Sequence, residues 1–362
     1  MNYDYLIIGS GLYGSICARE LTDMGYKCLV IEKRDHIGGN CYTENIDGIN
    51  VHKYGPHIFH TSDKGVWDYI RKYADFNHFS YRPKVNYKGK IYSFPINLMT
   101  LYQVYGVTTS DEAERKLSDV RVPIDSPKNL EEWVMSQVGP DLYNIFIKGY
   151  TTKQWNKNPK DLPASIIRRL PIRMTYDDNY YEDIYQGIPI GGYTQIFKAL
   201  LKGIEVRLGT DYFENREYFD GLVRKVIYTG PVDRFYDYKF GKLEYRSLRF
   251  ETMNLPMPYY QGVAGMNYTD AEVPYTRIVE HKHFEFGRQK NTIVTREYPE
   301  NKGEPYYPIN DSANNEVYKN YKTLMDREEK YVFGGRLADY KYYDMHQVVA
   351  SALTKVPKII FI

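Results

Sequence analysis

The sequence has few cysteines and no long hydrophobic run. Its three cysteines, Cys17, Cys28 and Cys41, include no C-x-x-C pair and no His/Cys cluster at the spacing of metal ligands. We therefore expect structural thiols, no disulfide framework and no metal site. No apolar run reaches the length of a transmembrane helix, and the first residues, MNYDYLIIGSG, lack the basic segment and cleavage site of a secretory signal. These absences predict a cytoplasmic protein.

The sequence also lacks an excess of charge of either sign. It has 48 Lys+Arg against 46 Asp+Glu in 362 residues, which gives no general reason to expect nucleic acid or an acidic membrane as a partner. Tyrosine is the residue in excess, with 39 Tyr against 15 Phe and 3 Trp. A tyrosine ring can stack on a ligand while its hydroxyl binds the ligand's oxygens, although any one tyrosine alone is expected to be a packing residue.

A glycine-rich turn near the start of the chain predicts a dinucleotide site. An apolar run at 5–8 is followed by GSGLYG, which supplies Gly9, Gly11 and Gly14, and then by residues with helical spacing. The first glycine permits a tight turn, the second lets a pyrophosphate approach the backbone, and the third allows close packing of helix on strand. A second apolar strand, CLVIE, ends in Glu32, where a carboxylate can bind an adenosine ribose.

The residues that follow Glu32 favour a flavin over a nicotinamide. KRDHIGGN places Arg34 and a Gly-Gly pair where a nicotinamide enzyme would continue into a simple crossover helix, and a second glycine pair lets the backbone approach a longer cofactor. This pattern resembles the FAD-binding domains of the glutathione-reductase and amine-oxidase type. A strand, a Gly-Gly turn and a helix at 330–356 are expected to close over the ribityl chain, with Asp344 near the helix start as a partner for its hydroxyls or phosphate. No second fingerprint for NAD(P) is convincing, because IPIGGYTQIFKALL lacks the third glycine.

The middle of the chain predicts two insertions into this FAD-binding domain. Apolar residues at helical spacing between 95 and 165, with Ser110 and Asn129 as expected N-caps, predict helices. Short β-rich stretches between 225 and 300 predict an antiparallel sheet. The expected fold is α/β, a discontinuous FAD-binding Rossmann-like domain with a helical insertion and an antiparallel β-sheet domain. The expected ranges are 1–80, 190–235 and 325–362 for the FAD-binding domain, 95–165 for the helical insertion with a mobile substrate loop at 163–189, and 81–94 and 236–324 for the sheet domain.

Arginine stands beside tyrosine in four separate segments. These are RRLPIRMTYDDNYY, VPYTRIVEHKHF, EPYYPIND and GGRLADYKYYD. Arginine binds phosphate through two parallel hydrogen bonds, and tyrosine hydroxyls can complete the shell of donors. One such segment is more readily explained as a solvated or salt-bridged face. Four of them in a protein with one cofactor already assigned favour a diphosphate ligand.

These motifs, in their order along the chain, resemble the bacterial UDP-galactopyranose mutases. The resemblance rests on YGPHIFHT, IKGYTTKQW, RRLPIRMTYDDNYY, YTGPVDRFYDYKFGKLEYRSL, VPYTRIVEHKHF, EPYYPIND and GGRLADYKYYDM, and it runs from Tyr3 to about Val356. It implies interconversion of UDP-galactopyranose and UDP-galactofuranose by a non-redox ring contraction, in which N5 of reduced FAD attacks the anomeric carbon. It also implies a homodimer that supplies galactofuranose for cell-surface polysaccharide. Acceptance of the N-acetylated sugar stays open.

The resemblance further implies roles for single residues. Arg169 and Arg277 would act as catalytic residues that grip the substrate diphosphate, and His60 would lie beside the isoalloxazine. The alternative for each arginine is a structural ion pair with a carboxylate, for example of Arg169 with Asp177 or Asp178, and the alternative for His60 is a hydrogen-bonded, half-buried histidine. The expected FAD-binding residues are Gly9, Gly11, Gly14, Glu32, Arg34, Gly39, Asn40, His57, Arg336, Asp344 and Met345. The expected substrate-binding residues are Phe146, Ile147, Tyr150, Thr151, Trp155, Arg169, Tyr180, Asn267, Arg277, Tyr307 and Tyr342.

Two positions depart from the family pattern, and two other function classes stay open. Ile147 is often aromatic in relatives of this family, and Tyr81 stands where some relatives carry Asn. An FAD-dependent oxidoreductase of the amine-oxidase superfamily would share the N-terminal fingerprint without needing a diphosphate pocket. A non-catalytic binder of flavin or nucleotide sugar would bind UDP without turnover.

Overall fold

The structure is a computed structural model that describes residues 2–168 and 170–360. It divides into two compact units, each described here by itself. Unit 1 comprises Met1–His78, Asp183–Tyr245 and Pro305–Ile362, and unit 2 comprises Phe79–Glu182 and Arg246–Glu304. The three domain ranges expected from the sequence stay a prediction.

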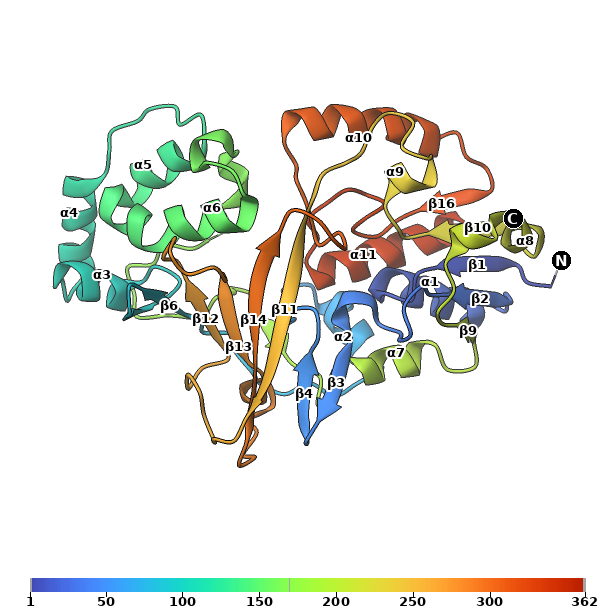
Figure 1. Ribbon diagram of the computed structural model, residues 1–362, viewed down its shortest axis with the longest axis horizontal. Helices are drawn as coiled ribbons and strands as arrows, with labels where there is room; N and C mark the ends of the chain where they lie inside the picture. Colours follow the sequence, from blue (N-terminus) through green and yellow to red (C-terminus); the bar gives the residue numbers. More distant parts are fainter. Residues whose placement is uncertain (1, 169, 361–362) are drawn as a thin grey trace. The chain divides into compact units, whose positions relative to one another are not determined.

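A five-stranded parallel sheet forms the centre of unit 1. The strand order is β16 (Tyr331–Phe333), β10 (Lys225–Tyr228), β1 (Tyr5–Ile8), β2 (Cys28–Ile31) and β9 (Glu205–Arg207). The runs YLII and CLVI are almost wholly buried, as expected for strands covered on both faces. Helix α1 (Leu12–Asp23) returns from β1 and packs against both β1 and α11 (Met345–Lys355) (Figure 1). The expected Rossmann-like fold is confirmed.

Smaller elements of unit 1 surround this sheet. Strand β5 (Phe59–Thr61) pairs with β8 (Tyr185–Gly187), so that His60 lies opposite Gln186. Strands β3 (Thr43–Ile46) and β4 (Ile49–His52) form a hairpin. The remaining helices and strand of unit 1 are α2 (Lys64–Ile70), α7 (Thr194–Leu200), α8 (Arg216–Gly221), α9 (Val232–Phe235), α10 (Ser312–Met325) and β15 (Tyr307–Pro308).

Unit 2 contains six strands in the order β11–β14–β13–β12–β6–β7. Their bounds are β11 (Tyr245–Leu255), β14 (Thr292–Glu300), β13 (Arg277–Glu280), β12 (Gly265–Tyr268), β6 (Lys84–Tyr87) and β7 (Lys90–Ser93). The expected antiparallel pairing is confirmed for four of the five neighbouring pairs, but β12 and β6 are parallel. Because these two strands are about 180 residues apart in the sequence, no short turn fixes their direction.

The expected helical segment is also part of unit 2. Its helices are α3 (Leu98–Tyr105), α4 (Ser110–Val120), α5 (Leu130–Leu142) and α6 (Gly149–Trp155), with a π-helical segment at Tyr143–Lys148 between the last two (Figure 1). Asn129 caps α5 as expected. The expected cap at Ser110 is wrong by one residue, because the Thr109 hydroxyl accepts the Glu112 N–H and leaves Ser110 as the first residue of α4.

No helix in 2–168 or 170–360 is long and apolar enough to span a bilayer.

Candidate functional site

Bare glycine backbone forms a cradle in unit 1 after β1. A Cβ at Gly14 would lie 2.1 Å from the Gly9 carbonyl oxygen, and one at Gly9, where φ is +103°, would lie 2.3 Å from Thr229 Oγ1. Gly11 is different, because its backbone is extended and a Cβ there would meet only the Gly39 Cα, at 3.9 Å. The two glycine turns therefore face each other without side chains, which is the arrangement that lets a pyrophosphate contact backbone N–H groups.

Glu32 lies at the end of β2, beside this cradle. It is 7% exposed, and its carboxylate accepts hydrogen bonds from the N–H and hydroxyl of Ser10, both at 2.9 Å, and from the Arg34 N–H at 3.1 Å. A carboxylate has further lone pairs, so this orientation still permits bonds to ribose hydroxyls. Arg34 donates to Asn40 Oδ1 at 3.1 Å and covers the ring of Tyr54. The predicted FAD-binding residues Glu32, Arg34 and Asn40 are thus brought together, and the residues present fit an FAD adenosine diphosphate.

His57, Arg336 and Met345, three other predicted FAD-binding residues, lie near one another in unit 1, and the predicted residue Asp344 caps α11. Burial and, to a smaller extent, the positive charge of Arg336 lower the pKa of His57 to about 4, although its hydrogen bond with Gly55 opposes the shift. The neutral His57 ring can donate its Nδ1 proton to the Gly55 carbonyl, 2.9 Å away. Arg336 itself donates to the Tyr306 carbonyl. Its charge also acts on Cys41, whose sulfur lies 3.7 Å from the Met345 sulfur.

The shifted pKa of His57 predicts acid sensitivity of the fold. An unfolded histidine binds a proton near pH 6.5 but the folded one only near pH 4, so stability is lost as the pH falls through this window. Between pH 7 and pH 5 this histidine should reduce the free energy of unfolding by about 2 kcal/mol. Urea unfolding at both pH values measures the effect. His57→Gln should remove that part of the loss, and the exposed His78→Gln should not; equal pH dependence in wild type and His57→Gln would refute the assignment.

His60 has a carboxylate partner that was not predicted from the sequence. Its Nδ1 lies 2.5 Å from Asp183 Oδ2, and the Ser62 hydroxyl donates to the other carboxylate oxygen at 2.8 Å. Burial lowers the pKa of His60. Burial alone would raise the pKa of the Asp183 carboxyl, but hydrogen bonds from His60 and Ser62 lower that pKa overall. The pair is therefore a neutral imidazole donating Nδ1–H to an ionised aspartate. The ring of His346 meets that of His60 edge-on at 5.0 Å. The flavin role of His60 stays a prediction.

Arg277 is the centre of the predicted substrate residues in unit 2. It begins β13 opposite Asn267 on β12, and its Nε donates to Asn267 Oδ1 at 3.1 Å. Its Nη2 donates to the Tyr150 hydroxyl at 3.2 Å, and Nη1 lies 3.7 Å from Glu297 Oε2 on β14. Burial raises the pKa of Glu297, while Arg277 opposes that shift. Sequence reasoning found Arg277, Asn267 and Tyr150 but missed Glu297, which faces Arg277 directly across the β13–β14 pair.

Tyr81 adds a buried hydroxyl next to this guanidinium. Burial raises the pKa of Tyr81 and the charge of Arg277 opposes the shift, so the two groups interact. Within the described residues the Tyr81 hydroxyl has no hydrogen-bond partner. A Cβ at Gly265 would lie 2.2 Å from this hydroxyl, so glycine is needed there. The predicted residue Tyr180 meets the Tyr81 ring edge-on at 5.5 Å. A buried donor without a partner beside a cation is chemistry suited to an oxygen-rich ligand.

Three predicted substrate residues lie inside the helical core of unit 2. Phe146 is 2% exposed and stacks on Phe94, with ring centres 6.1 Å apart. Ile147 and Thr151 are also buried. Trp155 ends α6 and is partly exposed. Phe146, Ile147 and Thr151 do not present open surfaces for uracil in this structure, and the roles of all four residues stay predictions.

The other three predicted substrate residues are Tyr307, Tyr342 and Arg169. In unit 1 the rings of Tyr307 and Tyr342 stack, with centres 5.4 Å apart. Arg169 lies outside the described residues. Of its two suggested partners, Asp178 pairs with Lys84 at 2.8 Å, and Asp177 lies 3.6 Å from Arg173.

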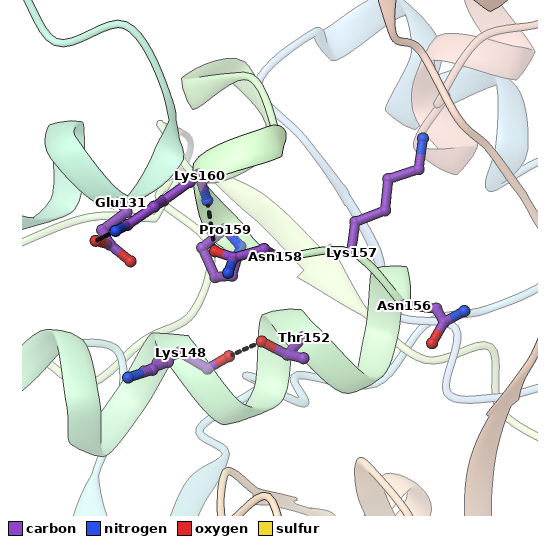
Figure 2. A pocket seen from close by; sticks show the side chains of 8 residues that line it. All are labelled: Glu131, Lys148, Thr152, Asn156, Lys157, Asn158, Pro159 and Lys160. Carbon is purple, nitrogen blue, oxygen red and sulfur yellow. Dashed lines mark hydrogen bonds and ion pairs between the residues drawn. The ribbon is translucent and has the colours of Figure 1, made fainter.

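A polar hollow of about 480 Å³ lies on another part of α6, and it holds none of the predicted site residues. Lys148 and Thr152 line it from the helical side and the segment 156–160 lines it from the other, as Figure 2 shows. Lys160 lies 3.6 Å from Glu131 within it. In the described part of the chain, the hollow included, no group of three or more His, Cys, Asp or Glu side chains is placed to hold a metal ion.

Comparison with known proteins gives matches over nearly the whole chain. The family model described as UDP-galactopyranose mutase matches residues 145–342, and a model of an NAD(P)-binding Rossmann-like domain matches 7–73. The dTDP-fucopyranose mutase of Escherichia coli is 42% identical over 363 residues, covering 96% of each chain. A Klebsiella pneumoniae protein described as "Probable UDP-galactopyranose mutase" is 40% identical, covering 97% of this chain and 93% of the relative.

The fold has a solved counterpart. A crystal structure of reduced UDP-galactopyranose mutase superimposes with a TM-score of 0.74 at 15% sequence identity, covering 99% of this chain and 94% of that one. The Rossmann-like domain and the family together imply a flavin cofactor. The chain belongs to the UDP-galactopyranose mutase family and is a flavin-dependent sugar-nucleotide isomerase.

Proposed function

We propose that the chain interconverts UDP-galactopyranose and UDP-galactofuranose, with FAD in its reduced form. The observation that carries this proposal is the Arg277 cluster, in which Asn267, Tyr150 and Glu297 hold one guanidinium from three directions. Such a fixed cation suits a diphosphate. Reduced FAD, when bound, supplies a nucleophilic N5 for the anomeric carbon of the sugar.

The residues of the chain would bind FAD, orient the nucleotide sugar and stabilise the charge that develops on it. The glycine cradle and Glu32 would hold the adenosine diphosphate of FAD, as the fit described above supports. Arg277 would offset the charge that builds on UDP as its bond to the anomeric carbon breaks, with Arg169 as a second cation. Holding UDP beside the sugar would favour recombination after the ring has changed size. Tyr81 would offer its hydroxyl to an oxygen of the substrate.

The test is the product formed from UDP-galactofuranose, separated by chromatography, with the protein reduced by dithionite or left oxidised. Turnover to UDP-galactopyranose in the reduced protein, and none in the oxidised one, is expected. Equal activity in both states would contradict the proposal. An amine oxidase would instead have its flavin reduced by an amine, and a non-catalytic binder would bind UDP with no product.

A second candidate substrate is dTDP-fucopyranose. The relative named for it is 42% identical and the one named for UDP-galactopyranose 40%, so overall similarity does not separate them. The two substrates differ at C6 of the sugar, at C5 of the base and at the ribose 2′-hydroxyl. A comparison of kcat/KM for both nucleotide sugars in the same assay decides between them.

We also propose that the segment 163–189 is a substrate lid. Pro163, Pro171 and Pro189 bracket a stretch rich in Tyr, Asp and Asn, a composition suited to a closing loop. Saturating UDP should quench or shift the fluorescence of Trp155 as this lid closes. Trp155→Phe should abolish the change, and Trp133→Phe, on α5, should retain it. An unchanged wild-type spectrum at saturating UDP would argue against closure.

Other proposals follow from the family rather than from the site. We infer a cytoplasmic homodimer that supplies galactofuranose for cell-surface polysaccharide. The domain ranges expected from the sequence are likewise kept as a proposal.

A further inference from the structure

Lys153 makes an unusual set of contacts beside the Arg277 cluster. It lies on α6 three residues after Tyr150 and four after Gly149, so it shares a helix face with both. Its ammonium lies within hydrogen-bonding distance of four backbone carbonyl oxygens, those of Tyr268 (2.8 Å), Asp270 (2.7 Å), Val273 (2.9 Å) and Tyr275 (3.0 Å). An ammonium has three protons, so at least one of them is shared.

All four carbonyls belong to residues 268–276, which run from the last residue of β12 to the residue before β13 and are called the β12–β13 loop. The ends of this loop are joined by a hydrogen bond from the Tyr268 N–H to the Thr276 carbonyl at 2.9 Å. Asn267 precedes the loop and Arg277 follows it, and these two residues are paired in the sheet. A change in the conformation of this loop, which Lys153 contacts, would therefore move Arg277 directly.

The same loop touches the start of α6 at a second point. A Cβ at Gly149 would lie 2.1 Å from the Thr269 carbonyl oxygen and 3.2 Å from the Ala271 nitrogen, so only glycine permits this approach. The Thr269 hydroxyl also donates to the Ile145 carbonyl at 2.6 Å. Tyr150 lies on the helix between Gly149 and Lys153, and its distance from Arg277 depends on both contacts.

The partly buried charge of Lys153 is balanced mainly by the loop. Burial lowers the pKa of Lys153 to about 8, and the negative charge of Asp270 opposes that shift. The carbonyl oxygens replace the water that the ammonium loses on burial. Without the Lys153 ammonium, these oxygens would lack this hydrogen-bond donor. Gly149 and Lys153, on one face of α6, thus hold the β12–β13 loop in place, and the Lys153 ammonium binds its carbonyl oxygens much as a metal cation binds oxygen ligands.

We propose that Lys153 is a positioning residue that fixes the β12–β13 loop against α6 and thereby sets the hydrogen bond between Tyr150 and Arg277. It acts on the substrate diphosphate only through Arg277, so this inference rests on the proposed function. A purely structural lysine would support the fold without any link to the Tyr150–Arg277 bond.

The test measures the dissociation constant of UDP by calorimetry, and kcat and KM with the reduced holoenzyme. Lys153→Met removes the donors while keeping most of the apolar stem, and should weaken UDP binding and raise KM about tenfold, as for loss of one charged hydrogen bond. Lys153→Arg should recover part of the loss, because it keeps the charge. Lys148→Met, an exposed lysine close to α6, is the matched control and should stay within about twofold of wild type.

A double-variant cycle separates positioning from mere support of the fold. In a Tyr150→Phe background the Tyr150–Arg277 bond is already gone, so Lys153→Met should cost clearly less there than in wild type. Additive effects, or unchanged UDP affinity in Lys153→Met, would overturn the proposal. If Lys153→Met does not fold, the same cycle is measured with Lys153→Arg, and additivity there overturns it too. Failure of the wild-type protein to bind UDP or turn over would instead refute the proposed function.

Discussion

Arg277→Met should lower kcat/KM about 10²–10³-fold while FAD stays bound, because a fixed cation at a developing charge contributes about as much as one oxyanion-hole donor. Arg277 is suited to this role by its rigidity. Its side chain is 21% exposed and is held by Asn267, Tyr150 and Glu297. Steady-state kinetics of the reduced enzyme measure the loss, and the flavin absorbance shows that the cofactor is retained.

Two controls make this result specific. Removing Arg277 leaves Glu297, whose side chain is 5% exposed, without its cation, so Arg277→Met/Glu297→Gln tests whether an orphaned carboxylate causes the loss. The double variant should remain as impaired as the single one. Arg249→Met breaks a 2.9 Å ion pair with Glu300 in the same sheet and should stay within about twofold of wild type, since exposed pairs contribute little. A value for Arg277→Met within twofold of wild type would refute the assignment.

Gly11→Val should abolish FAD binding without unfolding the protein. Because the Gly11 backbone is extended and a Cβ there meets only the Gly39 Cα at 3.9 Å, a side chain can begin at this position without backbone strain or a Cβ clash. It would fill the gap between the two glycine turns, where the pyrophosphate is proposed to lie. The flavin content per protein should fall at least about tenfold, since backbone hydrogen bonds to the phosphates would be lost.

The matched control for this variant is Gly221→Val. Gly221 ends α8 in the same unit, and a Cβ there would meet nothing within 4 Å. This variant should bind FAD normally. Circular dichroism should show an intact fold in both variants, and a full complement of FAD in Gly11→Val would contradict the proposed location of the pyrophosphate.

Local patterns in the sequence predicted the parts of the structure that depend on near neighbours. The strand, glycine turn and helix around Gly9, and the Asn129 cap, follow from spacing over a few residues, and the structure confirms them. The predicted cap at Ser110 is wrong by one residue because the neighbouring Thr109 is also a good capping residue, and Glu112 completes a capping box with Thr109.

Contacts between distant parts of the chain could not be predicted in this way. Asp183 lies 123 residues from His60 in the sequence. The residues whose carbonyls bind Lys153 lie 115 to 122 residues from Lys153. Neither the carboxylate nor a set of backbone oxygens leaves a pattern in the sequence. The parallel pairing of β6 with β12 could not be predicted for the same reason, because the two strands are far apart in the sequence. Arg277 stands in one of the segments where arginine lies beside tyrosine, and its specific role came from the family resemblance.

The measurement that tests the central claim most directly counts product molecules per electron. The holoenzyme is reduced anaerobically by light with one equivalent of electron pairs per flavin and no excess reductant, and UDP-galactofuranose is then added. If the flavin acts without net redox change, many molecules of UDP-galactopyranose should form per flavin while the absorbance stays that of reduced flavin. At most one product per electron pair, with flavin oxidised in step, would contradict the account and indicate an oxidoreductase.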